Sequence, residues 1–349
     1  MWNNCVLTMS NKLIIISNDQ FYYDKSNFYC DHVAEKTLPD GLSDKFSITV
    51  IGRISNIKRF HKLKTKNVEH HSNLISYLFS IFKRKIKGDY KFLILSISPY
   101  TFFASLLFIF SKTKPIVYLR SDGHQEYKSI LGFYGPFLYS LMFNITSKIS
   151  FFISCREHIL KKKPGKIVSP SELTNNWSQN IVKANFENIK LLYVGRVKVE
   201  KGIFSLLKLI ENNPSKISLT IVGENKHLES KINQKNVDIF PIENNEKNLI
   251  KFYDQHNIFV LPSYTEGHPM VLLESLARMR PVIIFEEIEH VIGSKKGIFV
   301  TRRESLSFFK TVNYIKKNYE AIYAEMKKNK LPTKNEFLKE LEQLVLKLH

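Results

Sequence analysis

Residues 258–285, IFVLPSYTEGHPMVLLESLARMRPVIIF, decide the fold. Their two ends, IFVLPS (258–263) and PVIIF (281–285), are short runs that are almost entirely apolar. Between them, MVLLESLARM (270–279) has the length and composition of a helix. Strands that are apolar on both sides are typical of a parallel sheet covered on both faces. The stretch therefore predicts a strand–helix–strand unit with two parallel strands.

The same alternation extends over the whole chain. Other strands are expected at residues 12–17, 46–52, 91–98, 115–121, 150–154, 189–195, 217–223, 237–240 and 297–300, and further helices at 203–213 and 246–255. This order predicts an α/β fold of two doubly wound, Rossmann-like domains. In such folds ligands bind at the carboxyl ends of the strands, and here we expect them in the cleft between the domains.

A linker separates the two expected domains. KKKPGKIVSPSELTNNWSQN, residues 161–180, is dense in Lys, Pro, Ser and Asn and holds no long apolar run. We therefore expect one domain at 1–168 and a second at 169–349. The tail from residue 304 is expected to be helical, with a break near Leu331 and Pro332, and to belong to the second domain.

Length and composition agree with two globular domains. The chain has 349 residues, of which 44% are hydrophobic and 24% are charged, and this excludes wholesale disorder, a collagen repeat and a disulfide scaffold. Cys5, Cys30 and Cys155 are scattered and show no zinc-binding spacing, so we expect free thiols in a reducing compartment. No signal-peptide pattern occurs, which favours a cytoplasmic location.

The formal net charge of +20 is concentrated in the first half of the chain. Residues 1–170 hold 25 basic and 11 acidic side chains, with the bases densest between 53 and 91. Such a patch favours a polyanionic partner: nucleic acid, an anionic membrane surface or a phosphorylated substrate. Charge is the only support for nucleic acid, because no zinc-finger, RNA-recognition or basic-zipper pattern occurs. A coding bias toward lysine explains part of the total but not its concentration.

Two uncharged stretches raise the question of a membrane span. Residues 92–111 are about long enough to cross a bilayer, but Ser98 and Pro99 divide them into an expected strand at 92–97 and a helix at 100–111. The second stretch, 129–147, is interrupted by glycines and a proline. We expect an interfacial role beside the basic patch, on an anionic membrane surface. The alternative for 100–111 is an ordinary core helix.

A first chemical signal is YVGRVKVEKG, residues 193–202. A strand ends at Gly195, Arg196 follows, and Lys201 stands directly before the next helix. This arrangement brings a guanidinium, an ammonium and the free N–H groups of a helix start toward one point, as is typical of a diphosphate site. Taken alone, two such cations are usually solvated surface residues.

The second signal is the pair Glu266 and Glu274 within residues 258–285. With Glu266 in the loop and Glu274 two turns along the helix, the carboxylates are roughly 10–12 Å apart. That spacing is too wide for a retaining glycosidase pair. It suits two acceptors for hydroxyl groups at opposite ends of one elongated ligand. The alternative for Glu274 is an i, i+4 ion pair with Arg278.

Together these signals resemble the family 4 retaining glycosyltransferases of the GT-B fold. The motifs are YVGR…EKG and the Glu-x7-Glu block from Pro262 to Ile283, with IVGE (221–224) between them, so the likeness is strongest in the second half of the chain. The resemblance implies that Gly195, Arg196 and Lys201 hold the donor diphosphate. It implies that Glu274 binds the ribose hydroxyls. It also implies that Glu266 faces the transferred sugar together with the backbone amides of Gly267, His268, Met270 and Val271.

The sequence departs from the family pattern at several points. The Gly-rich turn after the first strand is replaced by Ser17-Asn18-Asp19, Pro269 has no N–H to offer the sugar, and Met279 stands where a glycine is usual. In the first half, Arg120, Asp122 and His124 follow a strand and are candidates for acceptor contact. His124 is the candidate for the histidine that the family often has on the sugar side of the cleft, although a lone loop histidine is equally often a surface residue.

The resemblance therefore implies a retaining hexosyl-type glycosyltransferase, with Arg196, Lys201, Glu266 and His124 as catalytic candidates. The donor is expected to be a UDP- or GDP-sugar, and the acceptor a glycan, carried on a lipid, in bacterial capsule, O-antigen or exopolysaccharide synthesis. We expect no metal, because the two cations can neutralise the leaving group, and no cofactor. The expected location is the inner face of the cell membrane. Open alternatives are a nucleotide-sugar epimerase or a non-catalytic partner subunit of the same fold, and a basic polyanion-binding protein.

Overall fold

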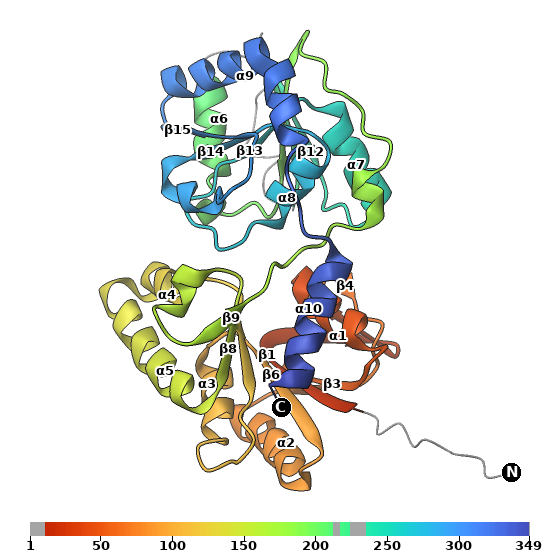
Figure 1. Cartoon of the computed structure of the whole chain (residues 1–349), viewed down its shortest axis with the longest axis vertical. Coiled ribbons are helices and arrows are strands. Elements are labelled where there is room, and N and C mark those ends of the chain that lie inside the picture. The colour runs from red at the N-terminus through yellow and green to blue at the C-terminus, as the bar shows by residue number, and fades with distance from the viewer. Residues whose placement is uncertain (1–10, 212–216, 224–234, 349) are drawn as a thin grey trace, which may run out of the picture. The chain divides into compact units, whose positions relative to one another are not determined.

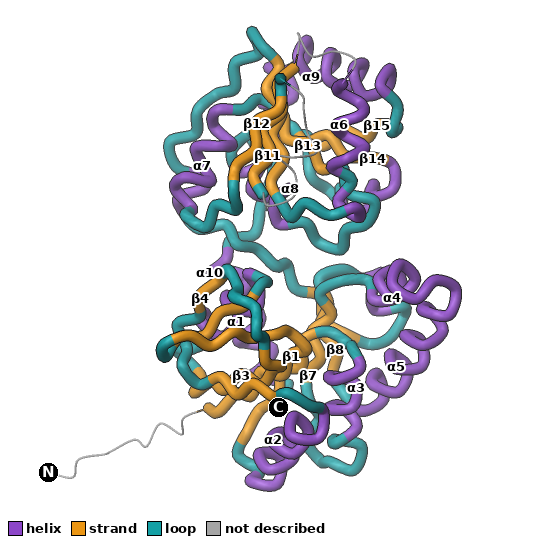
Figure 2. The backbone as a smooth tube through the Cα atoms, turned by 180° about the vertical axis from the view of Figure 1, so that it is seen from behind, coloured by secondary structure: helices purple, strands orange, loops and turns teal. Residues whose placement is uncertain are grey.

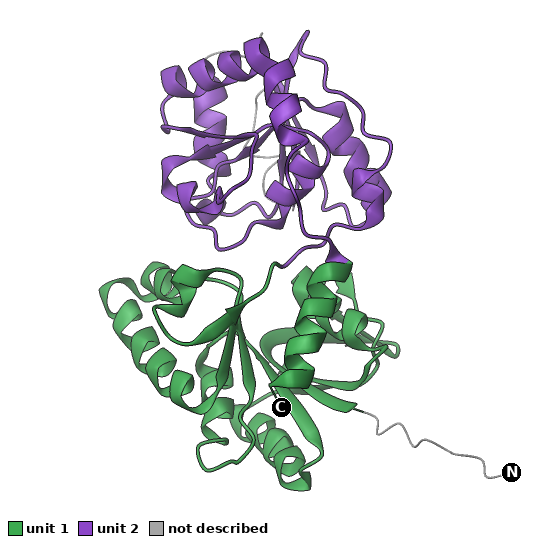
Figure 3. Cartoon of the chain, viewed as in Figure 1, with its two compact units in different colours: residues 1–169, 335–349 green, residues 170–334 purple. Residues whose placement is uncertain are grey.

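The computed structural model describes residues 11–211, 217–223 and 235–348 (Figure 1). Their contacts divide the chain into two compact units (Figure 3). Unit 1 comprises Met1–Ser169 and Asn335–His349, and unit 2 comprises Pro170–Lys334.

Unit 1 is built around a nine-stranded sheet whose central strands are all parallel. Its strands are β1 (Asn11–Asp24), β2 (Asn27–Cys30), β3 (Phe46–Ile54), β4 (His61–Lys62), β5 (Val68–His71), β6 (Tyr90–Leu95), β7 (Ile116–Leu119), β8 (Phe151–Ser154) and β9 (Gly165–Ile167). The parallel part runs in the order β5-β3-β1-β6-β7-β8-β9. The expected strands of the first half are thus confirmed. β2 and β4 form an antiparallel extension of β1 that the sequence analysis did not anticipate.

Helices cover both faces of the unit 1 sheet. They are α1 (Val33–Leu42), α2 (Leu74–Lys87), α3 (Pro99–Leu106), α4 (Gly123–Leu131), the 3-10 turn η1 (Gly132–Tyr134), α5 (Gly135–Ile149) and η2 (Glu157–Leu160). Alternate residues of β1 enter different cores: Leu13 and Ile15 pack with α1, whereas Ile14 and Ile16 pack with α2, α3 and α5. A strand that is buried on both sides in this way is apolar throughout, and this continuous apolar run is what predicted the strand from the sequence.

The stretch 92–111 divides at Ser98 and Pro99 as the sequence predicts, but α3 ends at Leu106 and not at the expected residue 111. β6 ends at Leu95, and Ser98 then opens α3 in a capping box with Thr101. No helix among the described residues is long and apolar enough to cross a membrane.

Unit 2 has a parallel six-stranded sheet in the order β12-β11-β10-β13-β14-β15, with helices on both faces (Figure 2). The strands are β10 (Ile189–Val194), β11 (Ile217–Val222), β12 (Val237–Phe240), β13 (Ile258–Leu261), β14 (Val282–Phe285) and β15 (Ile298–Thr301). The helices are η3 (Asn175–Ser178), η4 (Val199–Lys201), α6 (Ile203–Glu211), α7 (Glu246–Gln255), α8 (Met270–Ala277), η5 (Glu286–Val291) and α9 (Ser305–Met326). Residues 258–285 form the predicted unit, with β13 and β14 pairing in parallel around α8.

The C-terminal tail corrects the expected domain division. It is helical and broken near Leu331 as predicted, but its last helix, α10 (Lys334–Lys347), belongs to unit 1 and not to the second domain. The reason is its apolar side: Phe337, Leu341 and Val345 are buried in the same core as Leu38 of α1. The expected domain 169–349 therefore ends at Lys334.

Candidate functional site

The site begins where two neighbouring strands of unit 2 end very close together. Gly195 follows β10 with a φ of +152°, and its N–H donates to the backbone oxygen of Val222 over 2.9 Å. A Cβ on Gly223, at the end of β11, would lie 2.2 Å from the backbone oxygen of Gly195. Both positions therefore require glycine, which explains the repeated Val-Gly at these strand ends. At this part of the carboxyl edge of the unit 2 sheet, Gly195 and Gly223 place no side chains over the backbone.

Arg196 follows directly on this turn. The Tyr193 hydroxyl donates to the backbone oxygen of Arg196 over 2.7 Å and so holds the turn against β10. The Arg196 side chain is exposed and makes no hydrogen bond or ion pair with the described part of the chain. Its five N–H donors are thus available for an anionic ligand.

Lys201 and Glu266 form the contact at the centre of the site. Lys201 Nζ lies 2.6 Å from Glu266 Oε1, and the Ser263 hydroxyl donates to the same oxygen over 2.7 Å. Both side chains are largely buried. The structure thus joins two residues that are 65 positions apart in the chain. Because both donors approach Oε1, the other carboxylate oxygen of Glu266 has no hydrogen-bond partner among the described residues.

The loops that carry this pair are held together by backbone contacts. Gly202, with a φ of +67°, stands directly before α6 and so near to the end of β13 that a Cβ would lie 1.8 Å from the backbone oxygen of Pro262. Tyr264 N–H donates to the Glu200 backbone oxygen over 2.9 Å. These backbone contacts hold the two loops against each other and place Lys201 beside Glu266.

The loop continues into α8 with further anchors. His290 of η5 donates from Nε2 to the backbone oxygen of Glu266 over 2.7 Å, and His268 donates from Nε2 to Pro170 over 2.9 Å. Gly267 lies between them, partly exposed. The proline Pro269 caps the helix, so Met270 and Val271 are the first helical residues. Their amides have no earlier carbonyl within the helix to bind, as at every helix start, and are suitable donors for an anion or a polar ligand.

Glu274 lies in the second turn of α8 and is buried. The Tyr253 hydroxyl donates to Glu274 Oε2 over 2.8 Å. Burial raises the pKa of this carboxyl to about 7, and the hydrogen bond from Tyr253 offsets only part of that effect. A carboxyl group that is buried without a cation is costly for folding and typical of a functional site.

The alternative assignment of Glu274 as the partner of Arg278 is wrong. Arg278 is buried and donates to Asp254 through Nε (2.9 Å) and Nη2 (2.7 Å), and to the backbone oxygens of Trp177, Gln179 and Asn180. The guanidinium therefore anchors the chain segment that enters unit 2. The i, i+4 spacing on an isolated helix could not reveal this, because Asp254 lies on α7.

Arg303 also supports the site, although only a weak signal in the sequence points to it. Its Nη1 donates to the Ser205 hydroxyl (2.7 Å) and to the backbone oxygen of Pro262 (2.9 Å). The guanidinium also lies 4.1 Å from the ring centre of Tyr264. It thereby links the start of α6 to the end of β13. The signal in the sequence was weak: a basic residue shortly after the strand at 297–300.

His124 lies in unit 1, in the first turn of α4. It follows the helix-capping residue Asp122, whose side chain accepts from the His124 N–H over 3.0 Å. The imidazole packs against Tyr139, with 4.7 Å between ring centres. Burial lowers the pKa of His124, so the neutral ring is favoured near pH 7. The neighbouring candidate Arg120 is used internally, since it pairs with the buried Glu35 over 2.8 Å.

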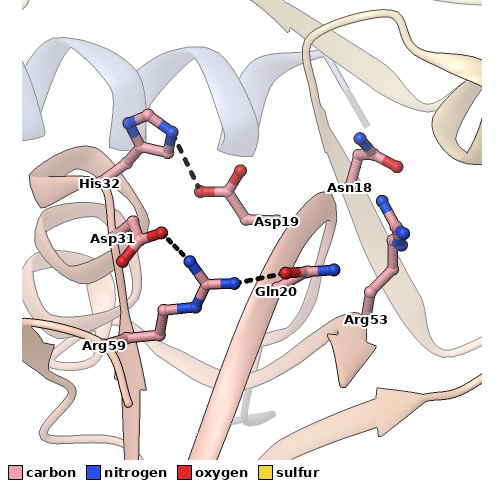
Figure 4. A pocket seen from close by; sticks show the side chains of 7 residues that line it. All are labelled: Asn18, Asp19, Gln20, Asp31, His32, Arg53 and Arg59. Carbon is pink, nitrogen blue, oxygen red and sulfur yellow. Dashed lines mark hydrogen bonds and ion pairs between the residues drawn. The ribbon is translucent and has the colours of Figure 1, made fainter. Parts of the chain in front are cut away.

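Unit 1 contains a polar pocket of about 210 Å³ beside the register shift of β1 between Ile16 and Gln20 (Figure 4). It is lined by Asn18, Asp19, Gln20, Asp31, His32, Arg53 and Arg59. Most of its charges are paired within the pocket: Arg59 binds Asp31 and Gln20, and His32 lies 3.9 Å from Asp19. Arg53 differs, because it stacks over the Tyr100 ring and has no carboxylate partner in the described chain.

The part of the chain that holds the Lys201–Glu266 pair has recognisable relatives. Residues 177–331 match the family model described as glycosyl transferases group 1. No curated protein matches the sequence. The family match includes every candidate residue of unit 2 and confirms the resemblance to glycosyltransferases at this broad level.

Solved structures show the same fold over nearly the whole chain. Sucrose-phosphate synthase from Thermosynechococcus elongatus is similar with a TM-score of 0.64 at 13% identity, covering 97% of both chains. The Anabaena protein Alr3699/HepE, solved in complex with UDP and glucose, reaches 0.69 at 11% identity, covering 97% of this chain and 100% of its own. The lipopolysaccharide outer core galactosyltransferase WaaB reaches 0.64 at 12% identity, covering 96% and 99%. The chain has the GT-B fold, with two Rossmann-like domains.

Proposed function

We propose that the chain is a retaining, metal-independent glycosyltransferase of family 4. It transfers a hexosyl group from a UDP- or GDP-sugar to a hydroxyl of a lipid-linked glycan in bacterial surface-polysaccharide synthesis. The observation that carries the proposal is the buried Lys201–Glu266 pair at the carboxyl edge of the unit 2 sheet, within the segment that matches group 1 glycosyltransferases. The Anabaena relative with bound UDP and glucose supports a nucleotide-sugar donor.

The donor diphosphate is assigned to the glycine-bordered strand end. The absence of a side chain at Gly195 lets phosphate oxygens approach the backbone, and Arg196 offers a planar pair of donors. Lys201 lies beside Glu266 and is shared between that carboxylate and the phosphate when donor is bound. The amides of Met270 and Val271 add the positive end of a helix dipole.

Glu274 and Glu266 are assigned to the two sugar rings of the donor. The buried Glu274 carboxylate accepts hydrogen bonds from the ribose hydroxyls, which replace part of the hydration it loses on burial. The oxygen of Glu266 that Lys201 and Ser263 leave uncovered accepts a hydroxyl of the transferred hexose. Hydroxyl recognition by fixed carboxylates gives specificity through the penalty of leaving them unpaired.

The proposed reaction needs no carboxylate nucleophile. The bond between the sugar anomeric carbon and the diphosphate oxygen breaks, and the acceptor hydroxyl oxygen bonds to that carbon on the same face. The acceptor proton passes to the leaving diphosphate, so charge and atoms balance. Arg196, Lys201 and the α8 amides stabilise the charge that builds up on the leaving group, and a metal ion is not required for that role.

The acceptor is assigned to unit 1. The pocket in Figure 4 offers carboxylates and amides as hydroxyl acceptors, and Arg53 as a cation without an acidic partner. His124, held neutral by its burial, is a candidate to accept or orient the acceptor hydroxyl. A lipid-linked acceptor places the enzyme at the cytoplasmic face of the membrane.

Calorimetric titration with UDP and GDP tests the donor site. One nucleotide should bind, and Arg196→Ala and Lys201→Ala should each weaken it by about 1.5–3 kcal/mol, the range for hydrogen bonds to charged groups. Lys190→Ala is the matched control, because this exposed lysine lies at the opposite end of β10. Unchanged affinity in both site variants contradicts the assignment.

A further inference from the structure

Helix α2 carries apolar side chains on two opposite sides. Its inner side packs into the core through Tyr77 and Ile81. Its outer side carries a second stripe of exposed side chains at helical spacing, Ile75, Phe79, Phe82 and Ile86. At 100° per residue these four fall within a sector of about 60°. Ile75 is 81% exposed, so the stripe is left in water by the chain itself.

Two turns elsewhere in unit 1 carry the most exposed aromatic side chains. Phe110, in the turn after α3, is 98% exposed, and Phe133, between α4 and α5, is 91% exposed. α3 contacts both α2 and α5, and all three lie on the same face of the unit 1 sheet (Figure 1). We use the name apolar face for the exposed apolar side chains of these helices, of α4, and of the turns that follow α3 and α4. Its exposed members are Ile75, Phe79, Phe82, Ile86, Phe103, Ile109, Phe110, Ile130, Leu131, Phe133, Tyr134, Phe137, Leu138 and Leu141.

Lysines surround the apolar face. On α2, Lys83 is exposed about 70° from the centre of the stripe, and the exposed Lys87 ends the helix. Lys85, on the other side of the stripe, is half-buried and donates to the backbone oxygen of Leu107 over 2.6 Å. Other exposed lysines follow Phe110 and end α5: they are Lys112, Lys114 and Lys148. Residues 73–151 hold ten Lys or Arg but only three Asp or Glu. An aromatic stripe between lysines is the pattern of a helix that lies in the headgroup region of an anionic bilayer.

We propose that the apolar face docks unit 1 on an anionic lipid bilayer, with α2 lying in the plane of the surface. Helices α2 and α5 have 14 and 15 residues, too few to cross the roughly 30 Å hydrocarbon core. A second copy of the chain is the other occupant to consider. A two-fold interface brings the same patch together from both copies, and the excess of lysines would then face itself. Anionic headgroups complement that charge, and this assignment does not depend on the transferase activity.

Flotation of the purified full chain with vesicles tests the proposal. The chain should bind vesicles of phosphatidylcholine mixed with phosphatidylglycerol, bind phosphatidylcholine alone far less, and dissociate as salt is raised. Phe79→Ser with Ile86→Ser should weaken binding at least tenfold, because each side chain loses its burial in the headgroup boundary. Lys83→Ala with Lys87→Ala should weaken it about thirtyfold, at about 1 kcal/mol for each lysine.

Matched controls come from α9 in unit 2. Leu306→Ser with Tyr314→Ser removes equally exposed apolar side chains, and Lys310→Ala with Lys317→Ala removes equally exposed charges. Neither pair should change vesicle binding. If the α2 variant loses its folded structure by circular dichroism, Phe137→Ser with Leu141→Ser on α5 replaces it.

Three results would overturn the proposal. One is a folded chain that does not bind the anionic vesicles. Another is equal loss of binding in the α9 controls. The third is a dimer that the α2 substitutions dissociate, formed by a chain without vesicle affinity, which would assign the apolar face to a second copy.

Discussion

Replacement of Glu274 by glutamine should make the protein more stable and a poorer binder of nucleotide at the same time. Glutamine has the shape of glutamate and can accept the hydrogen bond from Tyr253 in the same place. It removes the ionisation that burial opposes. If Glu274 were a structural residue, loss of its charge would change stability alone. Opposite changes in stability and binding are expected only if the charge serves the ligand.

The magnitude follows from the pKa of Glu274, which burial raises from 4.5 to about 7. A group with a raised pKa in the folded state binds its proton more tightly there than in the unfolded chain. Its contribution to stability is therefore complete below pH 4.5 and is lost as the pH rises through about 7. A difference of about 2.5 pKa units corresponds to about 3 kcal/mol. Between about pH 5 and about pH 8 the advantage of the Glu274→Gln variant should grow by about 2.5 kcal/mol.

Urea unfolding of both proteins at the two pH values measures this difference directly. Glu187→Gln serves as the control for replacing a carboxylate by an amide, because this glutamate lies in the same unit and is exposed. Titration with the preferred nucleotide should show about tenfold weaker binding to Glu274→Gln at about pH 8, where the wild-type carboxylate is ionised, and a smaller difference at about pH 5. A stability gain that is the same at both pH values, or nucleotide affinity that is unchanged, would refute the reasoning.

Three further predictions concern the backbone and the supporting side chains. Gly202→Ala should lower the free energy of unfolding by about 2–4 kcal/mol, because the new Cβ meets a backbone oxygen at 1.8 Å. Gly88→Ala, with a φ of +76° but open space around it, should lower it by only about 1–2 kcal/mol. The turn between β1 and β2 has positive φ at Lys25 (43°) and Ser26 (75°). Lys25→Asn with Ser26→Gly should therefore raise the free energy of unfolding, measured by thermal unfolding, by about 1 kcal/mol. Lys25→Ala alone should not raise it. Arg303→Met should cost about 1.5–3 kcal/mol in urea unfolding, against less than about 0.5 kcal/mol for the exposed neighbour in Arg302→Met.

The sequence predicted most strands of the sheets well because parallel strands that are buried on both faces appear as short runs of consecutive apolar residues. It could not predict the β1–β2 hairpin, because the turn residues Lys25 and Ser26 are not the asparagine and glycine that such a turn prefers. Nor could it place α10. The apolar side of that helix could pack on any core, and the core that it shares with Leu38 contains residues about 300 positions apart in the chain.

For the candidate site, local patterns identified residues but not their partners. The strand–turn–helix setting pointed to Lys201 and to Glu266 separately, and their direct contact became visible only in the structure. The predicted partner of Arg278 was wrong for the same reason. The spacing along one helix pointed to Glu274, whereas the carboxylate that binds the guanidinium is Asp254 on the neighbouring helix α7. Met279 shows the opposite case. It stands where a glycine is usual and still adopts the left-handed backbone of one, with a φ of +54°.

Features that oppose folding are gathered at one edge of the unit 2 sheet. Gly195 and Gly202 require backbone conformations that other residues rarely adopt, and the position of Gly223 admits no side chain. A short distance along α8, Glu274 is buried as an acid without a cation. Each feature lowers stability, and an apolar or less constrained edge would fold more easily. What the arrangement provides is a close approach to the backbone at the glycines, the amides that begin α8, two fixed carboxylates, and Lys201 beside one of them. That combination suits a ligand with both a diphosphate and hydroxyl groups. The stability that Glu274→Gln is expected to recover is therefore a measure of what the fold gives up for that ligand.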